Sequence, residues 1–203
     1  MIQLLINELA GAIAQLLILA FFPFLWWLVT ARRKESVLSW LGLKKINHTG
    51  RLQHTILITA AASLTYAVLT GLCVGASTSG ITTAGSQFAG EGMSALPAAI
   101  VYAFIRTGLA EEIVFRGFVL KRTADRFGFA TGNLIQSTLF GLLHGLPFGV
   151  VSQSLPIALI LTILPGAFGY FQGWLNEKRC GGSIVPSWLL HGIMNLLVAC
   201  FSL

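Results

Sequence analysis

Long apolar runs, separated by short polar connections, dominate this chain of 203 residues. A helix that crosses a hydrocarbon core of about 30 Å needs about 20 apolar residues, because each residue advances it by about 1.5 Å. Six segments meet or approach this length: Leu4–Val29, Ile56–Ala76, Leu96–Leu120, Gly132 to about Leu146, Leu155–Trp174 and Ile184–Leu203. We expect the fourth to end early, because Pro147 and Gly149 interrupt it. The pattern predicts an all-α, polytopic membrane protein with about six transmembrane helices.

Composition supports the same class. The chain is 55% hydrophobic and only 10% charged, whereas about a quarter of the residues are charged in soluble domains. The net charge is +6, but the basic residues lie between apolar runs and do not line one solvated face. We therefore expect the lipid bilayer as a partner and no nucleic acid. Cys73, Cys180 and Cys200 have neither C-x-x-C nor zinc-finger spacing, so neither a disulfide framework nor a structural metal is predicted.

Basic residues also predict the orientation. They gather in the first, third and fifth connections, and the second and fourth contain none. Because Lys- and Arg-rich connections stay in the cytoplasm, we expect a multi-pass protein of the cell membrane with both termini on the non-cytoplasmic side. The first connection, 31–54, is the most basic. We predict a single integral-membrane domain over 1–203, with a motif-bearing core at about 96–203.

Three ionisable side chains interrupt the third apolar segment, at Glu111, Glu112 and Arg116. Each charge at membrane depth costs roughly 3 kcal/mol even on lenient scales, so these residues need partners, water or a function. On an ideal α-helix Glu112 and Arg116 share a face, whereas Glu111 is displaced from Arg116 by about 140°. The spacing predicts that Arg116 neutralises Glu112 and leaves Glu111 for water or substrate. Two adjacent carboxylates in a partly dry site also favour protonation of one, as a general base requires.

Few other polar residues lie deep in the apolar segments. His144 is in the fourth, and His191 and Asn195 lie one turn apart in the sixth. Counted from the cytoplasmic ends, Glu111 and both His residues fall roughly 10 to 20 Å deep. One buried His is ordinarily a hydrogen-bond partner between helices. Two acids, an Arg, two His and an Asn at one depth instead predict a functional site in a polar intramembrane cavity.

Three motifs follow in order on successive predicted helices: Glu111-Glu112-x-x-x-Arg116, Phe140-x-x-x-His144 and His191-x-x-x-Asn195. With Gly117 directly after the Arg, the ordered set resembles the CPBP family, also called the Abi or type II CAAX-protease family of glutamate-type intramembrane proteases. The resemblance covers roughly the second half of the chain.

The resemblance implies an intramembrane endopeptidase that acts on a membrane-embedded or membrane-associated peptide or protein and needs no cofactor. Glu111, with help from His144, would activate the water that attacks the peptide bond. Asn195, together with His191, would donate hydrogen bonds to the oxyanion, and one such donor is typically worth about 3 kcal/mol.

The same resemblance gives Glu112 and Arg116 the task of holding the site together or assisting in substrate binding. Phe148 follows His144 by four residues, at a position where the prenyl-processing branch of the family carries a second Asn. The resemblance is therefore greater to prokaryotic members that are linked to peptide or bacteriocin maturation, self-immunity or protein sorting.

Two alternatives remain. Glu111, His144 and His191 are the ligand types of a catalytic zinc site, although no His-Glu-x-x-His helix is present. A non-enzymatic immunity or adaptor protein would use the same polar residues as contacts between helices. An aspartate dyad within one chain is excluded, because Asp125 is the only Asp.

Overall fold

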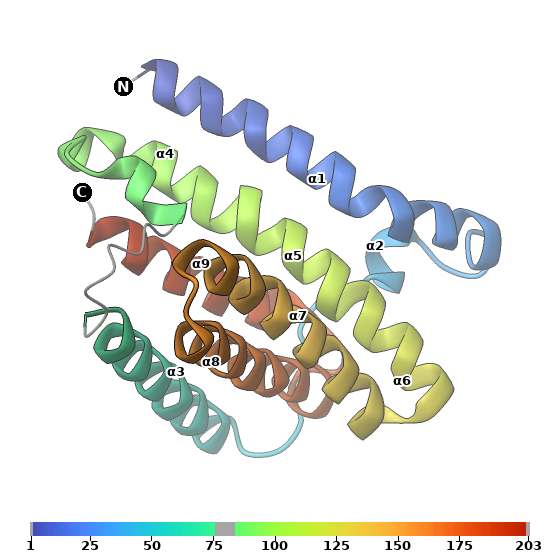
Figure 1. The fold of residues 1–203 in the computed structure, drawn as a ribbon. Coiled ribbons are helices and arrows are strands. Elements are labelled where there is room, and N and C mark those ends of the chain that lie inside the picture. Colours follow the sequence, from blue (N-terminus) through green and yellow to red (C-terminus); the bar gives the residue numbers. More distant parts are fainter. Residues whose placement is uncertain (1, 76–83, 202–203) are drawn as a thin grey trace. The chain divides into compact units, whose positions relative to one another are not determined.

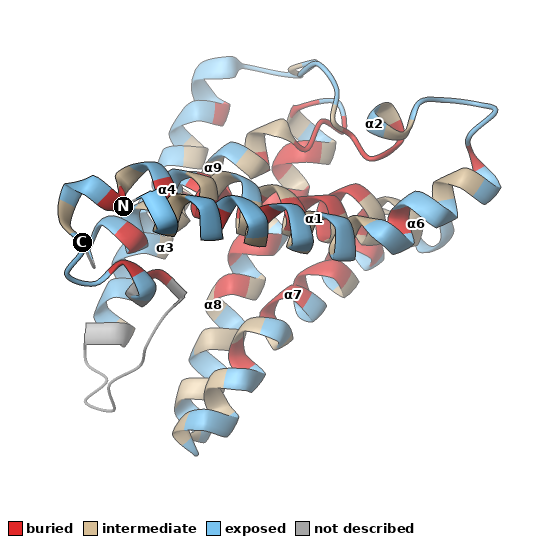
Figure 2. Ribbon diagram, turned by 90° about the horizontal axis from the view of Figure 1, so that it is seen from above, coloured by how far each residue is buried: buried red, intermediate tan, exposed pale blue. Residues whose placement is uncertain are grey.

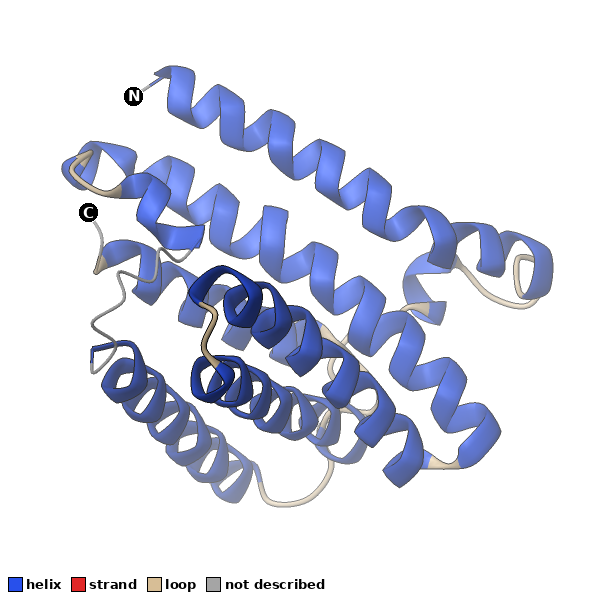
Figure 3. Cartoon of the chain, in the orientation of Figure 1, coloured by secondary structure: helices blue, strands red, loops and turns tan. Residues whose placement is uncertain are grey.

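The computed structural model describes residues 2–75 and 84–201, and all regular structure in these residues is helical (Figures 1 and 3). The α-helices are α1 (Ile2–Thr30), α2 (Val37–Trp40), α3 (Leu52–Gly75), α4 (Leu96–Ile100), α5 (Ala110–Glu112), α6 (Lys121–Phe127), α7 (Phe129–Ser152), α8 (Leu155–Trp174) and α9 (Val185–Cys200). Segments η1 (Ala84–Phe88) and η2 (Gly92–Ala95) are 3₁₀-helical, and η3 (Val101–Leu109), η4 (Ile113–Leu120) and η5 (Leu175–Arg179) are π-helical. The prediction of an all-α protein is confirmed.

Within the described residues, five helices are long and apolar enough to cross a membrane. They are Ile2–Thr30, Leu52–Cys73, Gly92–Phe127, Phe129–Ser152 and Leu155–Arg179. The sixth predicted segment forms α9, which has only 16 residues and is shorter than the length needed for a perpendicular crossing. The chain is a multi-pass membrane protein, and the predicted count of six spans holds only approximately.

The fourth predicted segment extends further than expected. Helix α7 continues through Pro147 and Gly149 to Ser152 instead of ending near Leu146. Proline removes one backbone hydrogen bond, but neighbouring helices can stabilise a membrane helix that contains it. Here Gly149 packs so closely on α8 that a Cβ atom would collide with the side chain of Ala158.

The helix from Gly92 to Phe127 departs from ideal α-helical geometry on both sides of Glu111 and Glu112. Segments η3 and η4 are π-helical, with hydrogen bonds between residues five apart. Residues five apart are therefore separated around the helix axis by less than the 140° expected of an α-helix. Such segments are rare and often occur at functional sites.

The chain divides into two compact units. The first unit comprises Met1–Lys44, Thr82–Phe118 and Ile184–Leu203, and the second comprises Lys45–Ile81 and Val119–Ser183. The single domain over 1–203 stays a prediction.

In the first unit, α1 and α9 both pack against η3. Figure 1 shows α1 running alongside the helix that contains α4 and α5. The buried cluster in this part of the first unit contains small side chains, including Ala98, Ala99 and Ala103, which are almost completely buried. Small residues let helix backbones approach closely in lipid, where apolar side chains alone give no preference for protein over solvent.

In the second unit, α7 and α8 form an antiparallel hairpin. The chain reverses at Gln153, whose φ of 51° is left-handed, and Ser154 then caps the N-terminus of α8. Gly141 and Gly145 pack against Thr162, where a Cβ atom on either glycine would collide with it. Helix α3 packs against α8.

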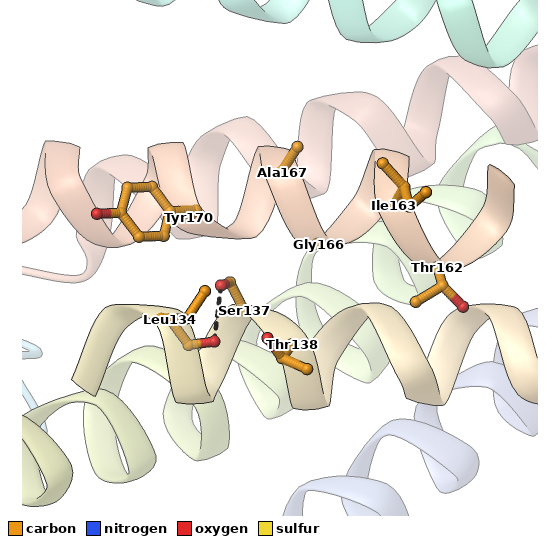
Figure 4. Close-up of a pocket in the computed structure, with 8 residues that line it drawn as sticks. All are labelled: Leu134, Ser137, Thr138, Thr162, Ile163, Gly166, Ala167 and Tyr170. Atoms are coloured by element: carbon orange, nitrogen blue, oxygen red, sulfur yellow. Dashed lines mark hydrogen bonds between the residues drawn. The ribbon is translucent and has the colours of Figure 1, made fainter. Parts of the chain in front are cut away.

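A groove of about 440 Å³ lies between α7 and α8 in the second unit (Figure 4). Its lining consists of Leu134, Ser137, Thr138, Thr162, Ile163, Gly166, Ala167 and Tyr170. The Ser137 hydroxyl donates a hydrogen bond to the backbone oxygen of Leu134, so this polar group is satisfied within its own helix. The groove contains none of the predicted site residues.

Burial follows the pattern expected of a protein in lipid. Figure 2 shows buried positions in stripes along the helices, with exposed positions on the opposite faces. Exposed side chains include Leu17 on α1 and Leu64 on α3, whereas Glu112 and Arg116 are buried. This charged pair is thus enclosed, while these apolar side chains face outward, as expected in a bilayer.

Candidate active site

Glu112 is fully enclosed and holds three partners within the first unit. Arg116 Nη1 lies 3.2 Å from Oε1, one turn further along the helix. Nδ1 of His191 lies 3.1 Å from the same oxygen, and the hydroxyl of Ser187 donates a hydrogen bond to Oε2. The carboxylate of Glu112 therefore accepts two hydrogen bonds from α9 and forms an ion pair with Arg116.

Arg116 is as deeply buried as its partner, with 0% of either side chain exposed. This ion pair is the one that the spacing of Glu112 and Arg116 predicts. Such a pair persists in a dry interior only when its geometry is good and additional hydrogen bonds satisfy the charges. The adjacent Gly117 leaves room for close packing, because a Cβ atom there would lie 2.8 Å from the backbone oxygen of Leu41.

His191 lies between the two carboxylates. Its Nδ1 contacts Glu112, while its Nε2 is 3.7 Å from Oε2 of Glu111. A carboxylate accepts hydrogen bonds, so the contact with Glu112 places a proton on Nδ1. The 3.7 Å separation is longer than a hydrogen bond but short enough for a strong charge interaction when the ring is protonated.

Glu111 has a much less constrained environment than Glu112. Its side chain is 20% exposed, against 0% for its neighbour. Its Oε2 accepts no hydrogen bond from any residue that the structure describes. Of the two adjacent acids, Glu111 is the one whose carboxylate has capacity left for a water molecule or a substrate.

Asn195 lies one turn beyond His191 on α9. Its Nδ2 donates a hydrogen bond of 2.8 Å to Oγ1 of Thr107 on η3. The Thr107 hydroxyl itself lies 3.0 Å from the backbone oxygen of Tyr102, to which it donates. This chain of two hydrogen bonds fixes the orientation of the amide and leaves the second N–H of Nδ2 for another acceptor.

Helix α9 approaches η3 closely enough to bring these side chains together. Trp188 Nε1 donates to the backbone oxygen of Phe104 at 2.6 Å. A Cβ atom on Gly192 would collide with the ring of Phe104. Glycine at position 192 therefore permits the approach that sets His191 beside Glu112.

His144 belongs to the second unit. Its Nδ1 lies 2.8 Å from the backbone oxygen of Phe140, and the two rings are 4.4 Å apart between centroids. A carbonyl oxygen only accepts, so Nδ1 carries a proton, and in the neutral ring the lone pair is on Nε2.

Of the six predicted site residues, the first unit brings together Glu111, Glu112, Arg116, His191 and Asn195.

Two site residues, Ser187 and Thr107, were missed by sequence reasoning. A signal for Ser187 was present, because Ser187, His191 and Asn195 recur every four residues and so share one face of α9. No comparable pattern marks Thr107. A Thr in an apolar helix ordinarily bonds to its own backbone, as this one also does.

A protein-family model described as Type II CAAX prenyl endopeptidase Rce1-like matches residues 93–197. The match covers slightly more than half of the 203 residues and includes all six predicted site residues. The chain belongs to this Rce1-like family. No curated protein and no solved structure matches it.

Membership of the Rce1-like family confirms the resemblance based on the three motifs. It makes the chain a member of a family of peptide hydrolases embedded in the membrane. Helices α1 and α3 lie outside the matched residues.

One alternative to metal-free hydrolysis in this Rce1-like protein is a catalytic zinc site. Among residues 2–75 and 84–201, no three His, Cys, Asp or Glu side chains are grouped so that they could hold a metal ion. The nitrogen Nδ1 of His191 and the carboxylate of Glu112 are already engaged with each other.

Proposed function

We propose that this protein is an intramembrane endopeptidase that hydrolyses a peptide bond of a membrane-embedded or membrane-associated substrate, with Glu111 as general base. The observation that carries the proposal is the unequal environment of two adjacent acids. Glu112 is paired with Arg116 and accepts hydrogen bonds from Ser187 and His191, whereas Oε2 of Glu111 accepts no hydrogen bond from the described residues.

In the first step, a carboxylate oxygen of Glu111 takes a proton from a water molecule as the water oxygen bonds to the carbonyl carbon of the substrate. The C=O bond becomes single and its oxygen becomes an oxyanion. In the second step the oxyanion reforms the carbonyl, the C–N bond breaks, and Glu111 returns the proton to the leaving nitrogen. Positioned proton transfer of this kind contributes typically 10²- to 10⁴-fold to rate.

Two donors serve the oxyanion in this mechanism. Asn195 supplies the N–H of Nδ2 that Thr107 does not use. His191 supplies Nε2–H when its ring is protonated, since Nδ1–H is directed to Glu112. Glu112 accepts the hydrogen bond from Nδ1 of His191 and is itself paired with Arg116, so these two residues act by holding the imidazole in position.

His144 is proposed to assist Glu111 by accepting a hydrogen bond from the attacking water through Nε2. The hydrogen bond of Nδ1 to Phe140 supports this role, because it fixes the tautomer that has Nε2 as acceptor. We further propose that the basic connections face the cytoplasm, which places the substrate in the cytoplasmic half of the membrane.

The test compares membrane proteomes of cells that produce the wild type and Glu111→Gln, with identification of peptide termini. Gln keeps the size of Glu but cannot take a proton. We expect at least one membrane-associated protein to carry a new terminus in the wild type only. The variant must be inserted and as abundant as the wild type, which immunoblotting of membranes establishes.

Three results separate the alternatives. Biological function retained by Glu111→Gln would support a non-enzymatic adaptor and contradict the proposal. Cleavage abolished by a chelator and restored by zinc would replace the glutamate mechanism with zinc chemistry. Cleavage of a prenylated peptide, but not of its unmodified counterpart, would establish that the substrate is prenylated.

A further inference from the structure

Lys178 and Arg179 are two adjacent cations at the end of η5, in the second unit. The sequence of this unit contains seven Lys and Arg residues but only two acids. Both acids form ion pairs with residues of α6, Asp125 with Arg122 and Glu177 with Lys121. Among the described residues of this unit, no carboxylate forms an ion pair with Lys178 or Arg179. This end of the unit therefore has an excess of positive charge.

Both cations are held on aromatic rings. Nζ of Lys178 lies 4.4 Å from the centre of the Phe129 ring, and Cζ of Arg179 lies 5.1 Å from that of Trp174. Thr49 donates to the backbone oxygens of both cations, through its hydroxyl to Lys178 and through its N–H to Arg179. Carbonyl oxygens at a helix end repel an anion, and here these two are already satisfied. The positive charge can therefore attract a negatively charged ligand.

The groove between α7 and α8 belongs to the same unit. It follows α8 from Thr162 to Tyr170, eight residues or about 12 Å. Its volume of about 440 Å³ is in the range of small-molecule sites, about 300 to 1,000 Å³. Tyr170 lies at one end of the groove, and its hydroxyl points away from the other lining residues (Figure 4). Ile163 and Ala167 expose apolar surface along the groove.

The groove and the cations are arranged in sequence along one helix. Tyr170, Trp174 and Lys178 recur every four residues, so they lie along one side of α8 and η5. Tyr and Trp side chains concentrate where the hydrocarbon of a bilayer meets the headgroups. Lys178 lies eight residues beyond Tyr170, about 12 Å further along the axis. An apolar groove, an aromatic boundary and a cation thus follow one another, as acyl chain, glycerol and phosphate do in a phospholipid.

We propose that the second unit binds one anionic phospholipid at this place. An acyl chain occupies the groove, the ester oxygens lie beside the hydroxyl of Tyr170, and the phosphate is bound by Lys178. The length of the groove suits an acyl chain, because one leaflet contributes about 15 Å of hydrocarbon. A headgroup with net negative charge is preferred to a zwitterionic one, since no carboxylate of the described unit neutralises Lys178 or Arg179.

A membrane helix of a second copy is the other occupant that an apolar groove could hold. Gly166 and Ala167 in its lining are small enough to admit one. However, two copies in one membrane have the same orientation, so their basic ends would lie at the same level and repel each other. A helix would also leave the charge of Lys178 without a partner. The charge of this unit therefore favours the lipid.

The experiment titrates the purified, delipidated full chain with phosphatidylglycerol and with phosphatidylcholine of identical acyl chains. Native mass spectrometry counts the lipids bound. We expect one phosphatidylglycerol to bind the wild type at least about fivefold more tightly than phosphatidylcholine, and Lys178→Gln to remove this preference. Arg126→Gln, which removes an exposed cation of α6, should keep it. Glycerol 3-phosphate, which has the phosphate but no acyl chain, should not compete at the same concentrations.

A second pair of variants tests the groove. Ala167→Phe fills it with an aromatic ring and should lower the affinity for both lipids. Leu139→Phe, at an exposed position of α7 outside the lining, should leave both affinities unchanged.

Equal affinity of the wild type for the two lipids would overturn the inference, as would equal losses in Arg126→Gln and Lys178→Gln. Competition by glycerol 3-phosphate would contradict the part played by the groove. Unchanged lipid binding by Ala167→Phe also contradicts the inference. If that variant in addition converts a dimer into a monomer, the groove is occupied by a second copy.

Discussion

The two units bury different kinds of polar side chain. In the first unit the buried polar residues include Glu8, Glu112, Arg116 and His191, which all carry or can acquire charge. In the second unit they are neutral amides and hydroxyls, and the described ones with at most 1% exposure are Asn133, Gln136, Gln172, Asn176 and Ser183. The difference separates groups able to move protons from groups that hold helices together.

Two buried amides of the second unit bond to backbone oxygens of α8. Asn133 Nδ2 donates to the backbone oxygen of Tyr170, and Gln136 Nε2 donates to that of Gly169. Gln136 also donates to Oδ1 of Asn133, which links the two side chains on α7. Such bonds stabilise helix pairs in lipid without adding charge, at an average of about 0.6 kcal/mol each.

The charged groups of the first unit cost more to enclose and are arranged in matched pairs. Glu112 has Arg116, Glu8 has Arg106, and His191 lies between Glu111 and Glu112. An enclosed charge needs its partner, so we expect variants of the first unit to have larger effects than variants of the second.

The largest expected effect on stability is that of Arg116→Leu. It leaves the carboxylate of Glu112 without its cation in a fully buried position, and loss of one partner of such a pair typically costs 3 to 5 kcal/mol. Denaturant unfolding in detergent micelles measures the loss. Replacing both members, as Glu112→Gln with Arg116→Leu, should recover part of it, and a double variant no more stable than the single one would contradict the pairing.

Asn195→Ala is expected to lower kcat by roughly 10²- to 10³-fold, the usual cost of one oxyanion donor. The free energy of unfolding should change by only about 1 kcal/mol, since the variant removes one neutral hydrogen bond. Thr107→Val is the matched comparison, because it removes the acceptor that orients the amide but leaves the amide itself. A larger kinetic effect for Thr107→Val than for Asn195→Ala would argue against Asn195 as donor.

Ser187→Ala removes one of the two hydrogen bonds that Glu112 accepts. Hydrogen bonds to charged groups are worth about 1.5 to 3 kcal/mol, so we expect a loss of unfolding free energy in this range. Ser183→Ala alters another fully buried serine, which belongs to the second unit, and serves as the control. Equal losses of unfolding free energy in the two variants would show that the contact with Glu112 adds nothing to stability beyond that of another buried serine.

Gln136→Leu should have the smallest effect. Its Oε1 is buried and accepts no hydrogen bond from the described residues, so only the two bonds donated by Nε2 are lost. We expect the unfolding free energy to fall by about 1 kcal/mol and peptide cleavage to persist. Loss of cleavage at unchanged stability would mean that the second unit contributes more to the chemistry than neutral contacts.

The sequence was sufficient for the helices and for part of the site. Apolar run length located the spanning helices, and four-residue spacing predicted the pair of Glu112 with Arg116. The extension of α7 past Pro147 was not predictable, since it depends on packing of Gly149 against α8. The π-helical geometry was also not predicted. The expected spacing follows from 3.6 residues per turn of an ideal α-helix, and this helix departs from that value.

Contacts between residues distant in sequence were also not predictable. Glu8 and Arg106 are 98 residues apart, and neither the charge nor the hydropathy of α1 identifies the partner. Ser187 and Glu112 are 75 residues apart. Contacts of this kind depend on which helix faces pack together, which one sequence does not specify.

The most direct measurement compares Glu111→Gln and Glu112→Gln in the purified protein, with unfolding and peptide cleavage recorded on the same samples. If Glu111 is the base and Glu112 holds His191 in position, Glu111→Gln keeps the stability of the wild type and loses cleavage by at least about 10²-fold. Glu112→Gln then loses stability, because Arg116 remains buried without its counter-charge. Cleavage retained by a folded Glu111→Gln would contradict the mechanism.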